Sequence, residues 1–244
     1  MPGPSPDELA AEGAAALADL FPPFVRVALV PVADRRCPWP EEEAAVARAV
    51  PSRRREFLSG RAAAHAALAA IGRDQGPVEV GPRRQPRWPA GVVGSIAHAG
   101  AWAGAVVAGS EHARGLGLDI EVLDPPLPDD VERAVAGPLV AEPTGHPLDA
   151  YATKVAFSVR EAVFKCLFPF TEWLLEPTDV AVELDLREGR YRAVVSDRFR
   201  RAESVLPAIQ EATIAGRFAV IAGHLLTGAW VQAGGASAGG PVPT

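Results

Sequence analysis

The first third of the chain carries the hydrophobic spacing of helices. Apolar residues recur at intervals of three and four, and prolines separate the runs because proline cannot continue a helix. Ser52 is a suitable N-cap for the longest run, and Gly72 is a suitable end. The elements predicted here are helices over residues 7–20, 41–50 and 53–71, and a strand over residues 24–32.

Beyond this part the pattern changes to the two-residue alternation of strands. One run with helical spacing interrupts it at residues 151–168 and is expected to stop before Pro169. The proline-rich, acidic residues 124–147 predict a mobile connection with one short helix at 131–135. Strands are predicted over 92–96, 102–107, 116–122, 180–186, 191–195, 214–222 and 224–230, a loop over 81–91, and a disordered tail from 234, while 203–209 receive no assignment.

Composition and charge restrict the class of protein. A length of 244 residues suits one large domain or two small ones, and a net charge of −6 argues against a general nucleic-acid binder. Cys37 and Cys166 form neither a disulfide framework nor a CxxC metal site. The acidic N-terminal segment does not resemble a signal peptide, and no segment has the roughly 20 apolar residues of a membrane span. We therefore expect a cytoplasmic protein.

Two short motifs carry the candidate chemistry. Asp119 and Glu121 share one face of a predicted strand, because side chains at i and i+2 point the same way. Glu161 and Lys165 are neighbours on a predicted helix. Either motif alone is more often a solvated strand edge or a surface ion pair than a functional site. If strand and helix meet, the carboxylates suit Mg²⁺, which binds protein oxygens together with phosphate, and the expected chemistry is transfer of a phosphate-containing group.

Four stretches of the sequence together indicate a family. They are Arg53-Arg-Arg-Glu-Phe-Leu-Ser-Gly-Arg61, the segment from Arg83 to His98, Gly115-Leu-Gly-Leu-Asp-Ile-Glu121 and Phe157-Ser-Val-Arg-Glu-Ala-Val-Phe-Lys165. In order and spacing they resemble the 4'-phosphopantetheinyl transferases of the monomeric type that activates siderophore and surfactin synthases. The resemblance extends over about residues 20–230, and any one stretch alone would be weak evidence.

The resemblance implies a fold and an activity. The fold is α+β, a pseudo-dimer of two similar halves, each a small antiparallel sheet packed on a long helix. The halves would span residues 1–118 and 119–232, the second carrying most metal ligands, with a disordered tail at 233–244. The activity is transfer of the 4'-phosphopantetheine arm of coenzyme A to a serine of an apo acyl or peptidyl carrier protein, with release of adenosine 3',5'-bisphosphate.

The resemblance also assigns roles around the metal. Asp119, Glu121 and Glu161 would hold Mg²⁺, or Mn²⁺ as the alternative, with the coenzyme A pyrophosphate. Glu161 would be the general base for the carrier serine, directly or through a water, and Lys165 would stabilise the leaving phosphate. Asp119, Glu161 and Lys165 are thus the expected catalytic residues. The surrounding cations are expected to keep the carboxylates ionised at neutral pH.

The phosphates of coenzyme A would meet basic residues of the first two stretches. Arg53 and Arg61 match family positions that contact the 3'-phosphate and nearby phosphates, for which the planar guanidinium is suited. His98 matches a phosphate-binding histidine. Arg83 or Arg84 would approach the nucleotide from the loop, with Arg87 as a further candidate.

Two positions depart from the family pattern. Ala97 stands where a hydroxyl commonly precedes the histidine, so one contact is lost unless Ser95 supplies it. Gln85 stands where a basic residue often precedes the loop proline, and the charge would then come from its arginine neighbours.

Other function classes remain open on the sequence. A metal-dependent nuclease uses similar carboxylates and lysine, although the acidic net charge argues against it. A non-catalytic module that binds carrier proteins or coenzyme A is the third hypothesis, which the presence of all three carboxylates and the lysine disfavours. Fatty-acid, polyketide, nonribosomal-peptide and siderophore carriers are equally compatible with the sequence, and monomer is the family expectation.

Overall fold

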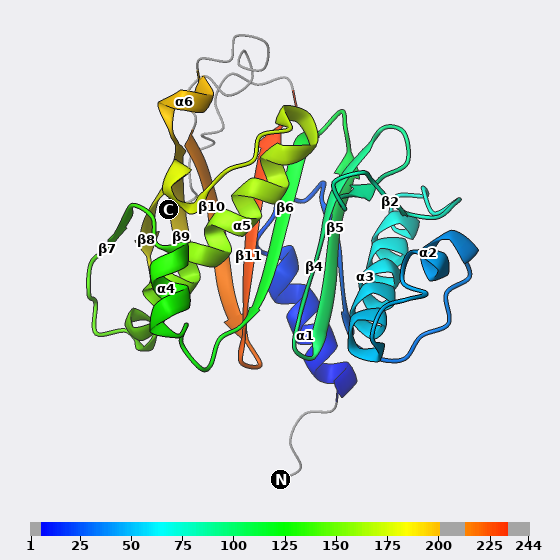
Figure 1. Cartoon of the computed structure of the whole chain (residues 1–244), viewed down its shortest axis with the longest axis horizontal. Coiled ribbons are helices and arrows are strands. Elements are labelled where there is room, and N and C mark those ends of the chain that lie inside the picture. Colours follow the sequence, from blue (N-terminus) through cyan, green and yellow to red (C-terminus); the bar gives the residue numbers. More distant parts are fainter. Residues whose placement is uncertain (1–5, 201–212, 234–244) are drawn as a thin grey trace.

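The computed structural model describes residues 6–200 and 213–233 and has a mixed α+β architecture (Figure 1). The helices are α1 (Pro6–Ala18), α2 (Pro40–Ala45), α3 (Pro51–Ala69), α4 (Asp129–Val135), α5 (Ala152–Thr171) and α6 (Asp197–Arg200), with 3-10 turns at Pro147–Tyr151 and Pro177–Asp179. The strands are β1 (Arg26–Pro31), β2 (Glu79–Val80), β3 (Pro86–Arg87), β4 (Val92–Ala99), β5 (Trp102–Gly109), β6 (Ala113–Val122), β7 (Leu139–Ala141), β8 (Val180–Asp185), β9 (Arg190–Val195), β10 (Thr213–Ile221) and β11 (His224–Gln232).

Within the described residues the strands form two main sheets and one short hairpin. A three-stranded antiparallel sheet has the order β1-β5-β4, and a six-stranded sheet has the order β6-β11-β10-β9-β8-β7. The short pair β2-β3 stands apart. Strands β4 and β6 run close together where the two main sheets meet, and the Ser95 hydroxyl accepts a hydrogen bond from the Leu118 N–H there at 3.0 Å.

Side-chain alternation along the strands assigns the helices to the two faces of the sheets. Ala105 and Val107 of β5 pack against small residues of α3, whereas Val106 and Ala108 face a cluster that includes Leu17 of α1. Helix α5 covers the six-stranded sheet with a row of small and branched apolar residues. The two long helices α3 and α5 therefore lie on the same side of the strands, as Figure 1 also shows, with α1 on the opposite side.

The predicted elements are largely present, with corrections at their ends. Helix α3 begins at Pro51 and its N-cap is Val50, so Ser52 is not the cap, because Pro51 already satisfies the first helical position. Pro169 does not end α5, which continues to Thr171. The proline lies in the last turn of the helix, so it interrupts the hydrogen bonding of that turn alone. Glu172 then adopts a left-handed conformation with φ 55°.

The connection at residues 124–147 is more ordered than predicted. It contains α4 near the expected position and also strand β7, which pairs in parallel with β8 and was not predicted. The buried Arg160 side chain donates to the carbonyls of Pro138 at 3.0 Å and Val180 at 3.1 Å, and so joins this segment to the sheet. Residues 203–209 and the predicted tail lie outside the described residues.

The two sheets differ in size, and the boundary proposed at residue 118 falls inside β6. The mixed α+β class is confirmed, and the pseudo-dimeric relation of two halves stays a prediction. None of the helices in the described ranges combines the length and apolar character that a bilayer crossing requires.

Candidate active site

Strand β6 presents one polar face and one apolar face. Leu116, Leu118 and Ile120 are buried in the cluster beneath the strands. The alternate positions, Gly115, Gly117, Asp119 and Glu121, face α5. A Cβ at Gly115 would lie 2.2 Å from the Cys166 carbonyl oxygen, so the helix backbone rests directly on the strand. The absence of side chains at the two glycines therefore sets the distance between strand and helix, and the next two residues of the same face meet the helix with carboxylates.

The Asp119 carboxylate is the centre of the constellation. It is 4% exposed, and each of its oxygens has its own donor from α5. Lys165 Nζ donates to Oδ1 at 2.6 Å, and Ser158 Oγ donates to Oδ2 at 2.8 Å. The structure thus brings together strand and helix motifs that are more than 40 residues apart in the sequence, as predicted.

Glu121 and Glu161 lie beside this pair with their carboxylates uncommitted. Within the described part of the chain neither side chain accepts a hydrogen bond. Burial raises the pKa of Glu121 to about 7, and the negative charge of Asp119 adds to the effect. Burial also raises the pKa of Glu161, although the Lys165 ammonium opposes the shift. The expectation that neighbouring cations keep the carboxylates ionised at neutral pH is therefore wrong for Glu121, because desolvation outweighs the ammonium charges there, and it stays a prediction for Glu161.

Lys165 shows the opposite balance. Burial lowers the pKa of its ammonium, but the charge and hydrogen bond of Asp119 and the charges of Glu161 and Glu121 outweigh burial and raise it. Lys165 therefore stays protonated at neutral pH.

The carboxylates suit a hard cation by donor chemistry. All the donors are oxygens, and the uncommitted ones belong to Glu121 and Glu161, which is the donor set that Mg²⁺ accepts. Over residues 6–200 and 213–233, however, no three His, Cys, Asp or Glu side chains are grouped as a ready metal site. The Mg²⁺ site thus stays a prediction supported by the type of donors.

A second polar group joins the start of α3 to the end of β4. Arg53 Nη1 lies 2.6 Å from His98 Nε2 and 3.4 Å from Glu56 Oε2. Burial lowers the pKa of His98, and the positive charge of Arg53 lowers it further. The neutral imidazole then accepts from Arg53 at Nε2 and carries its hydrogen on Nδ1, 3.8 Å from Glu56. The structure therefore brings two of the predicted phosphate contacts together.

Arg61 lies deeper than a surface phosphate contact would. The residue is 5% exposed, and its guanidinium lies over the Phe57 ring at 4.4 Å. Among residues 6–200 and 213–233 its Nε has no hydrogen-bond partner. Burial lowers the pKa of Arg61 to about 10, with the charge of Glu42 opposing the shift. The predicted role of Arg61 at the 3'-phosphate stays a prediction.

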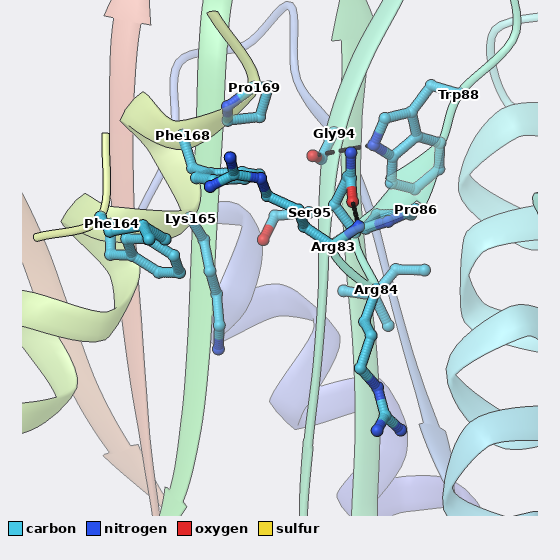
Figure 2. A pocket seen from close by; sticks show the side chains of 13 residues that line it. Arg83, Arg84, Pro86, Trp88, Gly94, Ser95, Phe164, Lys165, Phe168 and Pro169 are labelled. Carbon is cyan, nitrogen blue, oxygen red and sulfur yellow. Dashed lines mark hydrogen bonds between the residues drawn. The ribbon is translucent and has the colours of Figure 1, made fainter. Parts of the chain in front are cut away.

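A pocket of about 260 Å³ adjoins Lys165, between the 83–88 loop, β4 and α5 (Figure 2). The loop and α5 both contribute apolar and basic side chains to its lining. Figure 2 shows Arg83 reaching across to Phe168, with its guanidinium 5.9 Å from the ring centroid. The residues that line the pocket are Arg83, Arg84, Gln85, Pro86, Trp88, Gly94, Ser95, Ile96, Phe164, Lys165, Phe168, Pro169 and Leu174. Ser95 and both loop arginines thus share one cavity with Lys165, whereas Arg53 and His98 do not line it.

The two departures from the family pattern have structural settings. Ala97 is buried in the apolar cluster beneath the strands, on the face of β4 opposite His98. The Gln85 side chain accepts a hydrogen bond from the Arg83 N–H at 2.9 Å and so shapes the loop that carries the arginines.

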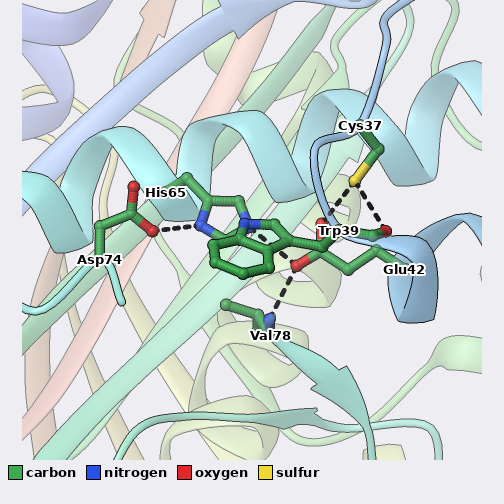
Figure 3. A network of polar contacts seen from close by, with 6 residues as sticks. All are labelled: Cys37, Trp39, Glu42, His65, Asp74 and Val78. Carbon is green, nitrogen blue, oxygen red and sulfur yellow. Dashed lines mark hydrogen bonds and ion pairs between the residues drawn. The ribbon is translucent and has the colours of Figure 1, made fainter. Parts of the chain in front are cut away.

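A polar network behind α3 was not predicted from the sequence (Figure 3). The Glu42 carboxylate is 1% exposed and accepts from His65 Nε2 at 2.8 Å, from the Val78 N–H at 2.7 Å and from Cys37 Sγ at 3.0 Å. His65 Nδ1 contacts Asp74 at 2.5 Å. Glu42 stands in a run of three glutamates, which is typical of a solvated helix face, so only the fold reveals its burial.

Comparisons with known proteins agree with these motifs. Residues 41–108 match a family described as the 4'-phosphopantetheinyl transferase N-terminal domain. The chain is 39% identical over 159 residues to 4'-phosphopantetheinyl transferase Svp of Streptomyces mobaraensis, covering 64% of each chain. It is 34% identical over 194 residues to 4'-phosphopantetheinyl transferase PptT of Mycobacterium tuberculosis, covering 78% of this chain and 84% of the other. Enterobactin synthase component D of Salmonella typhi is 37% identical over 122 residues, or 46% of this chain and 47% of the other.

The M. tuberculosis protein is matched over most of its length, and the matched family covers the segment that carries Arg53, Arg61 and His98. From its sequence motifs, the site they build and these relatives, the chain belongs to the 4'-phosphopantetheinyl transferase family.

Proposed function

We propose that the chain transfers the 4'-phosphopantetheine arm of coenzyme A to a serine of an apo acyl or peptidyl carrier protein and releases adenosine 3',5'-bisphosphate. The single observation that carries the proposal is the part-buried contact between Asp119 and Lys165 at 2.6 Å, beside two uncommitted carboxylates and a pocket lined by Lys165 and two arginines. This arrangement offers a fixed ammonium to a leaving phosphate and carboxylates to a cation and a proton.

Asp119, Glu121 and Glu161 would hold the divalent cation, Mg²⁺ or alternatively Mn²⁺. When bound, the cation would offset negative charge on the pyrophosphate. The raised pKa of Glu121, due first to burial, supports this assignment, because a cluster of desolvated carboxylates is stabilised by a positive ion. Lys165 already binds Asp119 Oδ1, which leaves Oδ2, held by Ser158, and the two glutamates as the remaining oxygens.

Glu161 is the proposed general base for the carrier serine. Burial raises its pKa above that of a free glutamate, which makes the carboxylate a stronger proton acceptor. Lys165, one helical turn away, keeps its proton and would stabilise the charge that develops on the leaving phosphate oxygen.

Arg53 and His98 are proposed to bind phosphate, with Arg61, Arg83, Arg84 and Ser95 as further coenzyme A contacts. The supporting observation is that Arg53 and His98 lie 2.6 Å apart at the start of α3, where free backbone N–H groups also favour anions. We further propose a monomer without nucleic-acid or membrane partners in the cytoplasm. The class of carrier stays open.

The decisive experiment offers coenzyme A and Mg²⁺ to a panel of apo carriers from fatty-acid, polyketide, nonribosomal-peptide and siderophore systems. We expect at least one carrier to gain the mass of one phosphopantetheine arm, and its serine-to-alanine variant to gain none. Failure on every carrier, while a known transferase modifies them, would reject the proposal. Cleavage of DNA under the same conditions would favour the nuclease alternative.

A second experiment tests the phosphate contacts. Arg53→Ala should raise KM for coenzyme A more than KM for 3'-dephospho-coenzyme A, because only the first carries the phosphate that the guanidinium would bind. Arg61→Ala is compared in the same assay, and Arg187→Ala, at an exposed turn outside the site, is the control. Equal effects on both substrates would remove the 3'-phosphate role.

A further inference from the structure

Two buried hydroxyls continue the polar contacts of Asp119 across three elements. Ser158 of α5 and Thr227 of β11 are both fully buried, and their oxygens lie 2.8 Å apart. Ser158 Oγ is also 2.8 Å from Asp119 Oδ2. Thr227 is the register partner of Asp119 in the β6–β11 ladder, so strand pairing itself places the two side chains next to each other.

The direction of the hydrogen bonds follows from the chemistry of the groups. An ionised carboxylate only accepts hydrogen bonds, so the single Ser158 hydrogen points to Asp119. The Ser158–Thr227 contact then requires Thr227 to donate to Ser158. The hydrogen bonds thus run from Thr227 to Ser158 and from Ser158 to Asp119 Oδ2. The other carboxylate oxygen accepts from Lys165.

These hydrogen bonds restrict rotation of the Asp119 carboxylate. With Ser158 on one oxygen and Lys165 on the other, both from the same face of α5, the plane of the Asp119 carboxylate is fixed at two points. Without the Ser158 bond, Oδ2 would lose its donor in a buried site, and the carboxylate would rotate toward other donors. Lys165 would then lose its fixed partner as well.

We propose that Ser158 and Thr227 are positioning residues that orient the Asp119 carboxylate and, through it, the Lys165 ammonium. Both side chains are fully buried and act through Asp119, and their action on the reaction rests on the function proposed above. The orientation itself is independent of that function and has its own measurement.

Thr227 offers a matched pair of substitutions. Thr227→Val keeps the shape and removes the hydroxyl, whereas Thr227→Ser keeps the hydroxyl and removes a methyl group. If the hydrogen bond matters, Thr227→Val should lower kcat by about tenfold with little change in KM for the carrier, as is typical of residues that orient a functional carboxylate. Thr227→Ser should stay close to wild type. Ser158→Ala, which removes the direct donor, should lower kcat at least as much.

The orientation can be observed without turnover, because Lys154 and Lys165 are the only lysines in the sequence. Protein labelled with ¹⁵N at the lysine side chains should give one ammonium signal for each, assigned with Lys154→Arg. We expect the Lys165 signal to shift and its hydrogens to exchange faster in Thr227→Val, but not in Thr227→Ser. Lys154, near the start of α5, contacts three backbone carbonyls at and after the end of β6. Its signal should stay unchanged and is the internal control of folding.

Each outcome decides a separate claim. An unchanged Lys165 signal in Thr227→Val would overturn the positioning role, as would equal losses of kcat in Thr227→Val and Thr227→Ser, which would indicate packing. A shifted signal with wild-type kcat would show that the orientation has no effect on the reaction and would also overturn the proposal. If wild type modifies no carrier, the proposed function fails, and the ammonium signals still decide the positional claim.

Discussion

Gly117 of β6 lies directly beneath the carbonyl oxygen of Ala162 in α5, and a Cβ built at Gly117 would be 1.8 Å from that oxygen. This contact sets the distance between the strand and the helix. Glu161 directly precedes Ala162 in α5, and Lys165 follows Ala162 by three residues, so the close approach at Gly117 places both side chains within reach of the β6 carboxylates.

Gly117→Ala should therefore damage both stability and activity. The added methyl group cannot be accommodated without moving the helix, because its nearest neighbours are backbone atoms. We expect a loss of about 1–3 kcal/mol in the free energy of unfolding, measured by urea titration, together with a larger fall in kcat than stability alone explains.

Gly76→Ala is the matched control, because in the described part of the chain no heavy atom other than those of its sequence neighbours lies within 4 Å of a Cβ at that position. It should change the free energy of unfolding by less than about 0.5 kcal/mol. A stable and fully active Gly117→Ala variant would show that the close approach is not required.

Lys165→Met should abolish most of the transfer activity. It removes the ammonium from a site with three carboxylates, so Asp119 loses its partner and the developing phosphate charge loses its donor. By analogy with the loss of one transition-state donor, kcat should fall by about 100- to 1,000-fold. Lys165→Arg, which retains the charge, should lose less, and equal losses in the two variants would argue for a geometric rather than an electrostatic role.

Lys154→Met should destabilise the end of β6. Lys154 is 7% exposed. Its ammonium donates to the carbonyls of Val122 at 3.0 Å, Leu123 at 2.9 Å and Pro125, all within four residues after Glu121. Removal takes a charged donor, itself buried, from three part-buried carbonyl contacts, which costs about 1–3 kcal/mol in the free energy of unfolding.

The exposed Arg26 is the comparison for Lys154, because its guanidinium also donates to backbone carbonyls, those of Pro23 and Val25. Arg26→Met should cost less than about 0.5 kcal/mol in urea unfolding, since water replaces the donor at an exposed site. Similar losses for the two variants would contradict the importance of burial.

The network behind α3 predicts a pH dependence of stability. Burial lowers the pKa of His65, but its hydrogen bonds to Glu42 and Asp74 outweigh burial and raise it above 6.5. Burial raises the pKa of Glu42, but its hydrogen bonds from His65, Cys37 and Val78 outweigh burial and lower it below 4.5. The stability that His65 contributes is therefore fully present below pH 6.5 and is lost as the pH rises through its folded-state pKa. The stability that Glu42 contributes is fully present above pH 4.5 and is lost as the pH falls through its folded-state pKa.

His65→Asn should accordingly be most destabilising between pH 4.5 and 6.5, by about 2 kcal/mol for lost hydrogen bonds to charged groups, and the difference should shrink at higher pH. Urea unfolding across pH 4–9 measures it. His112→Asn, at an exposed histidine, is the control. A destabilisation independent of pH would show that His65 acts by packing alone.

The sequence predicted most elements because their periodicity is a local property. The glycines and acids at alternate positions of residues 115–121 specified one face of a strand, and the spacing of Glu161 and Lys165 specified one face of a helix. It missed β7, because a three-residue strand in a proline-rich segment has no periodicity to detect, and its pairing with β8 depends on a distant partner.

The sequence alone thus predicted the candidate residues for the chemistry and determined which side chains share a face of a strand or helix, because that periodicity depends on neighbours along the chain. Only the tertiary structure decided that Lys165 binds one oxygen of Asp119 and that Ser158, itself bonded to Thr227, binds the other. It also decided that Glu121 is desolvated enough for its pKa to rise to about 7. Hydrogen-bond partners and burial depend on how distant segments pair. Strands β6 and β11, for example, are more than 100 residues apart and pair in a defined register that no local pattern encodes.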